Sequence, residues 1–270
     1  MLSSVEIATF MRDGFVPVRG AVPRPVVDAC VNVIWEELEA QGFARDDARS
    51  WSSPVVRIAS PDEGDRGRPL AEAATARLLW EAYDQLIGSD KWWKREGMGG
   101  TIPVRFPHTA DPKDAGWHIE TSFWTGTDWR TNIRSRDRGL LAIFLLTDVG
   151  PDDAPTRIRV GSHADAARVL APAGDEGLDM SAAGPPVVEA SAHRPVSHAT
   201  GAAGDVYLCH PFLVHAASWP HLGNSPRIIT QPGILLLEPF QLADRSAAYP
   251  VEAAIMDALG DQGHRASADR

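Results

Sequence analysis

The sequence predicts an α+β protein in which N-terminal helices precede a sandwich or jelly-roll core of short strands. Two observations support this class. Apolar residues recur at helical spacing in the first third of the chain, and short apolar segments between Gly, Pro and Asp turns follow Gly88. Short strands that succeed one another after a run of helices are typical of a chain whose core consists of packed sheets.

Helices and strands are expected in separate parts of the chain. Gly14 and Gly42 mark the ends of the first two helices. The expected helices are residues 5–12, 26–38 and 70–87. The expected strands are residues 15–18, 102–106, 117–123, 140–148, 156–160, 205–209, 214–219 and 227–237.

The chain is expected to form a single domain over residues 1–260, because it shows neither an internal repeat nor a linker. Residues 171–200 are rich in Ala, Gly, Pro and Ser without a clear period. That composition predicts a long loop with a short element inside it, and such loops often cover a site. Residues 261–270 are expected to form a disordered tail.

The charge of the chain excludes two classes of partner. The 270 residues contain 36 Asp and Glu against 26 Lys and Arg, which gives a formal net charge of -10. Proteins that bind nucleic acids or anionic membrane surfaces need clustered cationic side chains, so neither partner is expected. The longest apolar run, residues 140–146, is far short of a membrane span.

The cysteines and the N-terminal residues favour a cytoplasmic location. Cys30 and Cys209 are the two cysteines, and both lie in apolar patterns. They are therefore expected to be small core residues rather than a disulfide or part of a zinc site. Residues 1–15 lack the basic and apolar regions of a signal peptide. The oligomeric state stays open.

The sharpest chemical feature is Gly-Trp-His-Ile-Glu at residues 116–120. On a strand, side chains two positions apart point to the same face, so His118 and Glu120 would project into one cavity. An imidazole and a carboxylate that converge make two thirds of a two-histidine, one-carboxylate facial triad, which leaves positions on iron(II) open. Such pairs also arise by chance on surface strands, so this motif alone is weak evidence.

A second motif strengthens the first. An apolar strand, a turn, His215 in another apolar strand and Arg227 at the start of a third make a specific layout over residues 204–233. A buried guanidinium offers a planar, permanently charged fork that suits a carboxylate, and burying it without a partner is costly. The alternative for Arg227 is a surface salt bridge.

The two motifs together resemble the phytanoyl-CoA dioxygenase-like family of iron(II)/2-oxoglutarate-dependent oxygenases. The likeness rests on His-Pro-x-x-x-His at residues 210–215, on Phe-Met-Arg-Asp-Gly-Phe-Val-Pro-Val-Arg-Gly at 10–20, and on Gly-Ser-His at 161–163. It extends over roughly residues 5–240. The resemblance implies a double-stranded β-helix, that is a cupin-like jelly roll, with flanking N-terminal helices.

The resemblance also implies the site residues. His118 and His215 match the two iron-binding histidines, and Arg227 matches the arginine that pairs with the distal carboxylate of 2-oxoglutarate. Glu120 stands where the family usually has Asp, so its longer side chain must fold back or the metal must shift. Related oxygenases use His-x-Glu, so Glu120 is kept as the third ligand. A carboxylate at this position argues against a halogenase, in which a small residue leaves room for chloride.

The implied reaction uses iron(II), O₂ and the cosubstrate 2-oxoglutarate to oxidise a C–H bond of a small organic molecule, with hydroxylation as the favoured outcome. A specialised metabolite is the favoured substrate, and the acidic composition makes a CoA ester less attractive. Two rival functions are a cupin-like metalloenzyme that does not use 2-oxoglutarate and a non-catalytic jelly-roll binding module.

Further side chains are candidates for the cavity wall. Arg105 precedes the His-x-Glu motif, Thr156 follows the long apolar strand, and Gln231 follows Arg227; each is a candidate contact for the cosubstrate. Arg157, Arg159 and Thr230 lie on the same expected strands. Four tryptophans either line a substrate pocket or pack in the core, namely Trp117, Trp124, Trp129 and Trp219. The histidines ranked below His215 as metal ligands are His108, His163, His193, His198, His210 and His221.

Overall fold

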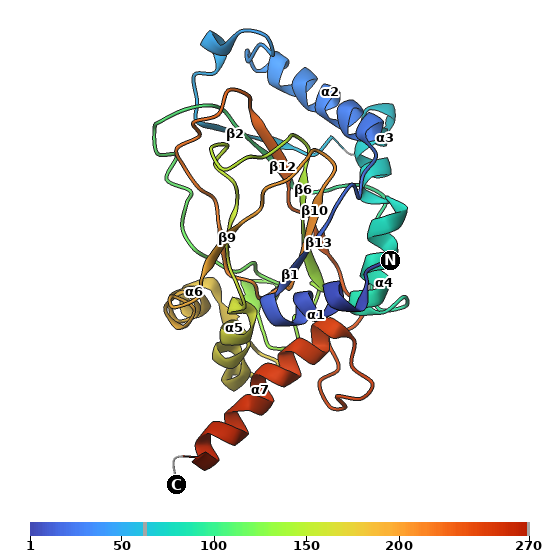
Figure 1. The fold of residues 1–270 in the computed structure, drawn as a ribbon, viewed down its shortest axis with the longest axis vertical. Helices are drawn as coiled ribbons and strands as arrows, with labels where there is room; N and C mark the ends of the chain where they lie inside the picture. The colour runs from blue at the N-terminus through green and yellow to red at the C-terminus, as the bar shows by residue number, and fades with distance from the viewer. Residues whose placement is uncertain (62–63, 269–270) are drawn as a thin grey trace.

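The structure, a computed structural model, describes residues 1–61 and 64–268. An antiparallel sheet of seven strands lies at its centre, in the order β1-β10-β6-β12-β3-β2 with β13 beside β6 (Figure 1). The strands of this sheet are β1 (Phe15–Val18), β2 (Val55–Ala59), β3 (Thr101–Arg105), β6 (Leu140–Leu145), β10 (Val206–Cys209), β12 (Arg227–Thr230) and β13 (Gly233–Ile234). The predicted α+β class, with N-terminal helices before a core of strands, is confirmed, and the strands are antiparallel.

Strand β6 is the middle of the core. All six of its residues are apolar and buried, as expected of a strand that is covered on both faces. Leu140, Ala142 and Phe144 belong to the large core beneath the helices, whereas Leu141, Ile143 and Leu145 belong to a smaller cluster on the other face. The alternation of side chains along the strand therefore divides the interior into two layers.

A second antiparallel sheet covers the smaller cluster, in the order β11-β7-β9. Its strands are β7 (Arg157–Arg159), β9 (Val196–His198) and β11 (His215–Ala216). Ile158 of β7 packs in the same cluster as Ile143 of β6, so the two sheets lie face to face. The first residue of β11 is His215, which places that imidazole on the second sheet.

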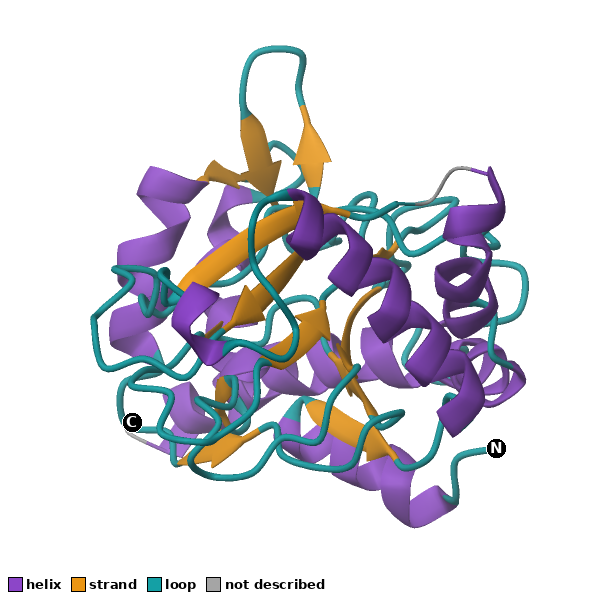
Figure 2. Ribbon diagram, turned by 90° about the horizontal axis from the view of Figure 1, so that it is seen from above, coloured by secondary structure: helices purple, strands orange, loops and turns teal. Residues whose placement is uncertain are grey.

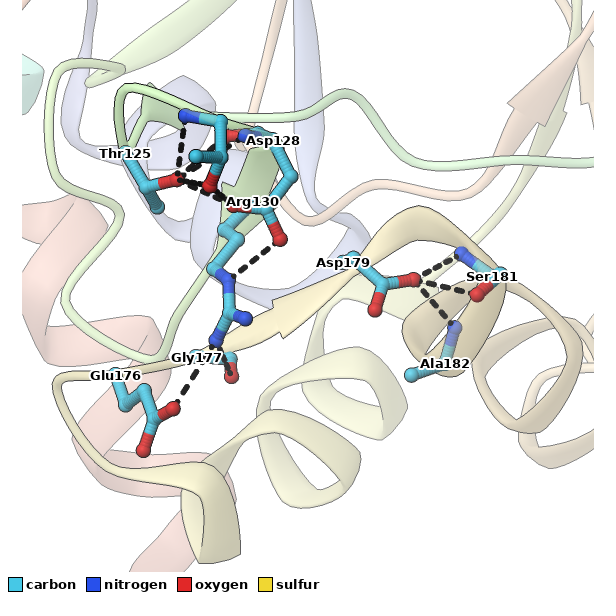
Figure 3. Close-up of polar contacts among 9 residues, drawn as sticks. Thr125, Asp128, Arg130, Glu176, Gly177, Asp179, Ser181 and Ala182 are labelled. Carbon is cyan, nitrogen blue, oxygen red and sulfur yellow. Dashed lines mark hydrogen bonds and ion pairs between the residues drawn. The ribbon is translucent and has the colours of Figure 1, made fainter.

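A small third sheet contains β4 (Phe123–Trp124), β5 (Trp129–Thr131) and β8 (Leu178–Asp179). Figure 3 shows how polar contacts hold it together: Thr125 donates to Asp128 across the turn, and Arg130 donates to Asp128 and to the Gly177 carbonyl. The carboxylate of Asp179 accepts hydrogen bonds from the first amides of helix α6 (Met180–Ala190) and so caps the N-terminus of that helix.

Helices flank the central strands, and one pair of strands extends beyond them (Figure 2). The helices are α1 (Ser4–Asp13), α2 (Arg24–Ala40), α3 (Gly64–Ala74), α4 (Arg77–Ile87), α5 (Ser162–Leu170), α6 (Met180–Ala190) and α7 (Pro250–Ala268), with short 3-10 helices at Ala48–Ser50 and Ala171–Ala173. Ser3 and Glu6 form a capping box at the start of α1, and Gly14 ends that helix with a positive φ, as predicted. None of the described helices is long and apolar enough to cross a membrane.

Two predictions about helices were wrong. The single helix expected at residues 70–87 is two helices, α3 and α4. The backbone at Ala76 is extended, so the helical hydrogen bonding is interrupted there. The long loop expected at residues 171–200 contains α6, an eleven-residue helix despite Pro185 and Pro186. The cap from Asp179 and the burial of Val187 stabilise a helix that local propensity disfavours.

Several predicted strands are shorter than expected. The segment expected at residues 117–123 forms a single bridge and then the two residues of β4, and the segment at 214–219 is reduced to β11. The strand expected at 227–237 is divided into β12 and β13 by Pro232, which has no amide hydrogen for a ladder. The single domain over residues 1–260 and the tail over 261–270 stay predictions; residues 269–270 lie outside the described residues.

Candidate metal centre and cosubstrate cavity

Two segments from distant parts of the chain meet at the candidate metal centre. The proximal segment, residues 114–122, contains His118 and Glu120, and the distal segment, residues 205–230, contains His215 and Arg227. His118 and His215 exchange two backbone hydrogen bonds of 3.0 Å each, which form an isolated antiparallel bridge. The bridge brings the two imidazole rings to a centroid separation of 4.5 Å.

Both imidazoles are oriented by their own backbone. Nδ1 of His118 lies 2.9 Å from the Gly116 carbonyl oxygen, and Nδ1 of His215 lies 3.0 Å from the Leu213 carbonyl oxygen. A carbonyl oxygen only accepts, so each Nδ1 carries the proton and donates it. Each Nε2 therefore keeps its lone pair, as in metal-binding histidines whose other ring nitrogen donates to a carbonyl or carboxylate oxygen.

The carboxylate of Glu120 completes a group of three. Its Oε1 lies 3.7 Å from Nε2 of His118 and 3.5 Å from Nε2 of His215. The ligand atoms of the three residues all lie within 4.8 Å of one another, and among the described residues no other such group of histidine, cysteine and carboxylate side chains is found. The extra methylene of Glu120 thus does not keep its carboxylate away from the two imidazoles.

The charges in the group favour an ionised carboxylate. Burial opposes the charge on Glu120, but the close imidazoles of His118 and His215 hold the pKa of its carboxyl well below the usual range, and the charge of Arg138 adds to this. Burial also opposes the charge on His118, yet its contacts with Glu120 and Gly116 raise the pKa of its imidazole. A cation is therefore favoured between these three side chains.

The donor set fits iron(II). Nε2 of His215 is buried and has no hydrogen-bond partner among the described protein atoms, which is costly unless another group binds it. Two imidazoles and one carboxylate are the ligands of the facial triad that binds non-haem iron and leaves positions open. These residues can therefore hold the metal that the donor types imply.

A cavity of about 330 Å³ opens in front of the three residues. Arg227 lies in its wall, is 2% exposed, and donates one hydrogen bond of 2.6 Å to the Ala154 carbonyl oxygen. Its Nε has no partner, and no carboxylate of the described residues forms an ion pair with it. Burial, and secondly the charge of Arg105, lower the pKa of Arg227 to about 9. Burial of the charged guanidinium thus costs free energy, and a bound anionic ligand would reduce that cost.

Arg105 lies directly opposite Arg227, because β3 and β12 pair these two residues in register. Arg105 is also buried, but Nη2 donates to both oxygens of Asp114, at 2.9 Å and 2.8 Å. Asp114 also accepts from Arg57, at 2.5 Å, and all four side chains line the cavity. One carboxylate therefore serves two guanidinium groups, and no carboxylate among the described residues lies within ion-pair distance of Arg227.

The sequence matches the family described as Phytanoyl-CoA dioxygenase (PhyH) over residues 10–228, which is most of the chain. The chain belongs to the phytanoyl-CoA dioxygenase family. It is therefore an enzyme of the non-haem iron(II)/2-oxoglutarate-dependent class, in agreement with the family resemblance of the sequence. No curated protein sequence gives a significant match.

Solved structures with a similar fold include enzymes from nogalamycin biosynthesis. The epimerase SnoN, in complex with Fe3+, alpha ketoglutarate and nogalamycin RO, is 19% identical, with a TM-score of 0.53 over 87% of this chain and 82% of that one. The carbocyclase SnoK from nogalamycin biosynthesis is 16% identical, with a TM-score of 0.56 over 87% and 84%. HygX from Streptomyces hygroscopicus, with nickel and 2-oxoglutarate bound, is 18% identical, with a TM-score of 0.55 over 89% and 90%.

The seven residues that the sequence of this phytanoyl-CoA dioxygenase family member singled out as metal ligands or cosubstrate contacts lie around one cavity. The members of that set that line the cavity are Arg105, His118, Glu120, Thr156, His215, Arg227 and Gln231. Thr230 points elsewhere, and its buried hydroxyl has no partner. Arg157 and Arg159 are not part of the wall, because their guanidinium groups lie over the ring of Trp117.

The rival histidines lie away from the metal centre. His210 and His163 are buried 5.0 Å apart, measured between ring centroids, and contact backbone carbonyls of Val251 and Met11. Burial lowers the pKa of both imidazoles, so they pack as neutral rings. His108 and His221 form a bridge with each other, and His193 and His198 are exposed. Trp124 and Trp129 form an exposed cross-strand pair, and Trp219 lines a different cavity.

Three charged residues of the site were missed at the level of sequence. Arg57 lies on β2, a strand that the sequence did not suggest, and Asp114 lies in the loop before the His-x-Glu motif. Arg138 donates from Nε to the Thr121 carbonyl oxygen at 2.9 Å. The alternation in Val55–Ala59 could have indicated β2, but no local signal links Arg57 to Asp114, which lie 57 positions apart.

Proposed function

We propose that the protein oxidises a C–H bond of a small organic molecule, most simply by hydroxylation. In this proposal His118, Glu120 and His215 hold iron(II), and Arg227 binds the distal carboxylate of 2-oxoglutarate. The observation that carries the proposal is the convergence of three donor side chains in front of a cavity that also contains a buried guanidinium with which no described carboxylate forms an ion pair. We further propose that the two facing sheets form a double-stranded β-helix, the jelly roll of this family.

The protein side chains supply binding and orientation. Bound iron(II) and 2-oxoglutarate would supply the oxidising chemistry with O₂. The two imidazoles present Nε2 because their Nδ1 protons are donated to backbone carbonyls. Glu120 supplies the negative charge that the metal requires, and its low pKa keeps it ionised at neutral pH.

The wall of the cavity supports a dicarboxylate cosubstrate. Arg227 can offer the planar fork that a carboxylate matches, and its present contact with Ala154 leaves other donors free. Arg105 lies opposite, already held by Asp114, and adds a second positive charge. Thr156 and Gln231 supply a hydroxyl and an amide on the same wall, so we propose both as further contacts.

A polar small molecule is the favoured substrate. The cavity wall has charged, amide, hydroxyl and glycine residues, with Pro103, Ala217 and Ile229 as its apolar side chains, and this composition does not favour a long acyl chain. Solved structures of the same fold contain nogalamycin RO or hygromycin B. These observations support a specialised metabolite, and activity on CoA thioesters alone would overturn that choice.

The first experiment is an anaerobic titration with iron(II) and then 2-oxoglutarate. The ternary complex is expected to give a weak visible charge-transfer band that each component alone does not give. His215→Ala is expected to abolish the band, and Arg227→Leu is expected to require more 2-oxoglutarate. A saturated iron complex that gives no band with 2-oxoglutarate would favour a cupin-like enzyme with another cosubstrate.

The second experiment separates hydroxylation from other outcomes of the same chemistry. The purified enzyme is incubated with iron(II), 2-oxoglutarate, O₂ and a library of polar metabolites, and succinate formation identifies the substrate. Hydroxylation adds one oxygen atom to the product, whereas a product without added oxygen indicates desaturation, cyclisation or epimerisation. Mass spectrometry of the product under ¹⁸O₂ decides between them.

A further inference from the structure

The proximal segment carries two of the three metal-binding side chains without the support of a strand. Its backbone pairs with the distal segment through the single bridge between His118 and His215. The next regular ladder begins at Phe123, in β4. A segment with so few ladder bonds needs other anchors if its side chains are to stay in place, since metal sites tolerate little displacement of their ligands.

Arg157 on β7 supplies such an anchor. Its Nη2 donates to the Ala115 carbonyl oxygen at 2.7 Å, three residues before His118. Its Nε donates to the Ala217 carbonyl oxygen at 3.0 Å, two residues after His215. Arg157 thus joins the two segments that bear the metal-binding histidines. In the proximal segment its contact at Ala115 precedes His118, whereas Glu120 follows His118.

Trp117 strengthens this link. The guanidinium carbon of Arg157 lies 4.7 Å from the centroid of the indole, and that of Arg159 lies 4.5 Å from it. Trp117 immediately precedes His118, so the stacked side chains restrict the backbone at the ligand itself. Arg159 directs its hydrogen bonds elsewhere, to the Val188 carbonyl oxygen and the Ser191 hydroxyl near the end of α6.

We propose that Arg157 is a positioning residue that clamps the proximal and distal segments together and so sets the affinity and geometry of the metal centre. This inference rests on the proposed metal-binding role of His118, Glu120 and His215. Arg157 neither lines the cavity nor contacts those three side chains, so its effect passes through the backbone at Ala115 and Ala217.

The chemistry of the contacts explains why arginine stands at this position. Two carbonyl oxygens from different segments need two donors at a fixed separation, and one planar guanidinium supplies both while its face covers the indole. A lysine has a single ammonium on a flexible stem, and it would reach one carbonyl at a time. Among the described residues no acidic side chain forms an ion pair with Arg157 or Arg159, so the backbone contacts are not secondary to a salt bridge.

Arg159 provides a matched control for an experiment. Arg157→Met and Arg159→Met each remove one cation from the same indole, and the two residues lie two positions apart on β7. Only Arg157→Met also removes hydrogen bonds to the proximal and distal segments, because the hydrogen bonds of Arg159 go to residues at the end of α6. The measured quantities are the Mn(II) dissociation constant of the full-length protein, obtained by competition with a chelator, and the visible absorption bands of the Co(II) form.

Arg157→Met is expected to weaken Mn(II) binding by about 10- to 100-fold, as losses of outer partners of metal ligands typically do, and to change the Co(II) bands. Arg159→Met is expected to weaken Mn(II) binding by less than about threefold. Equal effects of the two variants, or wild-type affinity in Arg157→Met, would overturn the proposal, because the role of Arg157 would then be packing alone.

Arg157→Lys keeps the result decisive if Arg157→Met does not fold. Lysine can satisfy one carbonyl, so an intermediate loss of Mn(II) affinity is expected, and a wild-type value would count against the clamp. The wild-type protein is titrated first, with His215→Ala beside it. If the wild type binds no Mn(II) that depends on His215, the proposed function fails, and this result differs from a clamp that has no effect.

Discussion

The proximal and distal segments both contribute side chains to the candidate metal centre, but their backbones have different structures. The distal segment places His215 and Arg227 on strands of the two facing sheets, and both side chains are almost fully buried. The proximal segment lies outside any strand, and the side chain of His118 is 42% exposed. One half of the site is therefore part of the sheet framework, and the other half is attached to it.

The difference shows how an irregular segment can still present ligands accurately. Carbonyl oxygens of the proximal segment accept from arginine side chains of neighbouring elements, at Ala115 from Arg157 and at Thr121 from Arg138. These two contacts lie on either side of the His-x-Glu motif. Side-chain donors thus replace the ladder of hydrogen bonds that a strand would have, and they leave the ligand segment accessible from the cavity.

The largest expected effect comes from loss of a ligand on either segment. His118→Ala and His215→Ala are each expected to lower turnover by more than about 100-fold. Loss of a residue that only hydrogen-bonds to a metal ligand already lowers metal affinity or activity by about 10- to 100-fold. The metal-free proteins are expected to differ: His215→Ala lowers the melting temperature more, since His215 is buried. Calorimetry without metal checks this, and equal melting temperatures would contradict the contrast between the segments.

The next effect concerns the buried cation of the distal segment. Arg227→Leu is expected to weaken 2-oxoglutarate binding by about 30-fold or more, since loss of one partner of a buried charge pair costs at least about 2 kcal/mol. Without 2-oxoglutarate the variant is expected to be as stable as the wild type or more so, because an uncompensated charge has been removed. Isothermal titration and thermal unfolding measure the two quantities.

Arg57 is the control for that prediction on the exposed side of the cavity. Its side chain is 49% exposed, so its ion pair with Asp114 is screened by solvent. Arg57→Gln is expected to change 2-oxoglutarate affinity by less than about fivefold. An effect as large as that of Arg227→Leu would show that both sides of the cavity wall hold the cosubstrate.

A smaller effect is expected from pH. The pKa of His118 is raised in the metal-free protein, chiefly by Glu120 against the opposing effect of burial, so metal must displace a proton from it. Mn(II) affinity is therefore expected to fall about tenfold for each pH unit below that pKa. The stabilising contact of protonated His118 with Glu120 is present below the ordinary histidine pKa and is lost as the pH rises through the raised value.

NMR titration of the metal-free protein checks the cause of this pH dependence. In Glu120→Gln the pKa of His118 is expected to return towards the ordinary value or below it, because the carboxylate no longer offsets burial. An unchanged His118 pKa in that variant would show that Glu120 does not control the proton.

The smallest effect is a difference in local motion. Amide hydrogens of Ile119 to Thr121 are expected to exchange faster than those of Tyr207 and Leu208 in β10, because they lie outside a ladder. Added Mn(II) is expected to slow exchange more in the proximal than in the distal segment. Equal protection of both segments in the metal-free protein would remove the distinction between them.

The sequence determined the chemical part of the site. The spacing in His-x-Glu predicted that His118 and Glu120 converge, and the family resemblance added His215 and Arg227 as candidates, together with the oxygenase class. These features are readable because they depend on residue type and short spacing. The buried strand β6 and the helix signals around Gly14 were readable for the same reason.

Only the tertiary structure decided how these residues are supported. The strand expected around His118 did not form, because the proximal segment bonds to side chains instead of a neighbouring strand. The contacts that matter there join residues 42 and 57 positions apart, Arg157 with Ala115 and Arg57 with Asp114. Such contacts follow from the packing of whole sheets, and no local pattern of residues encodes them.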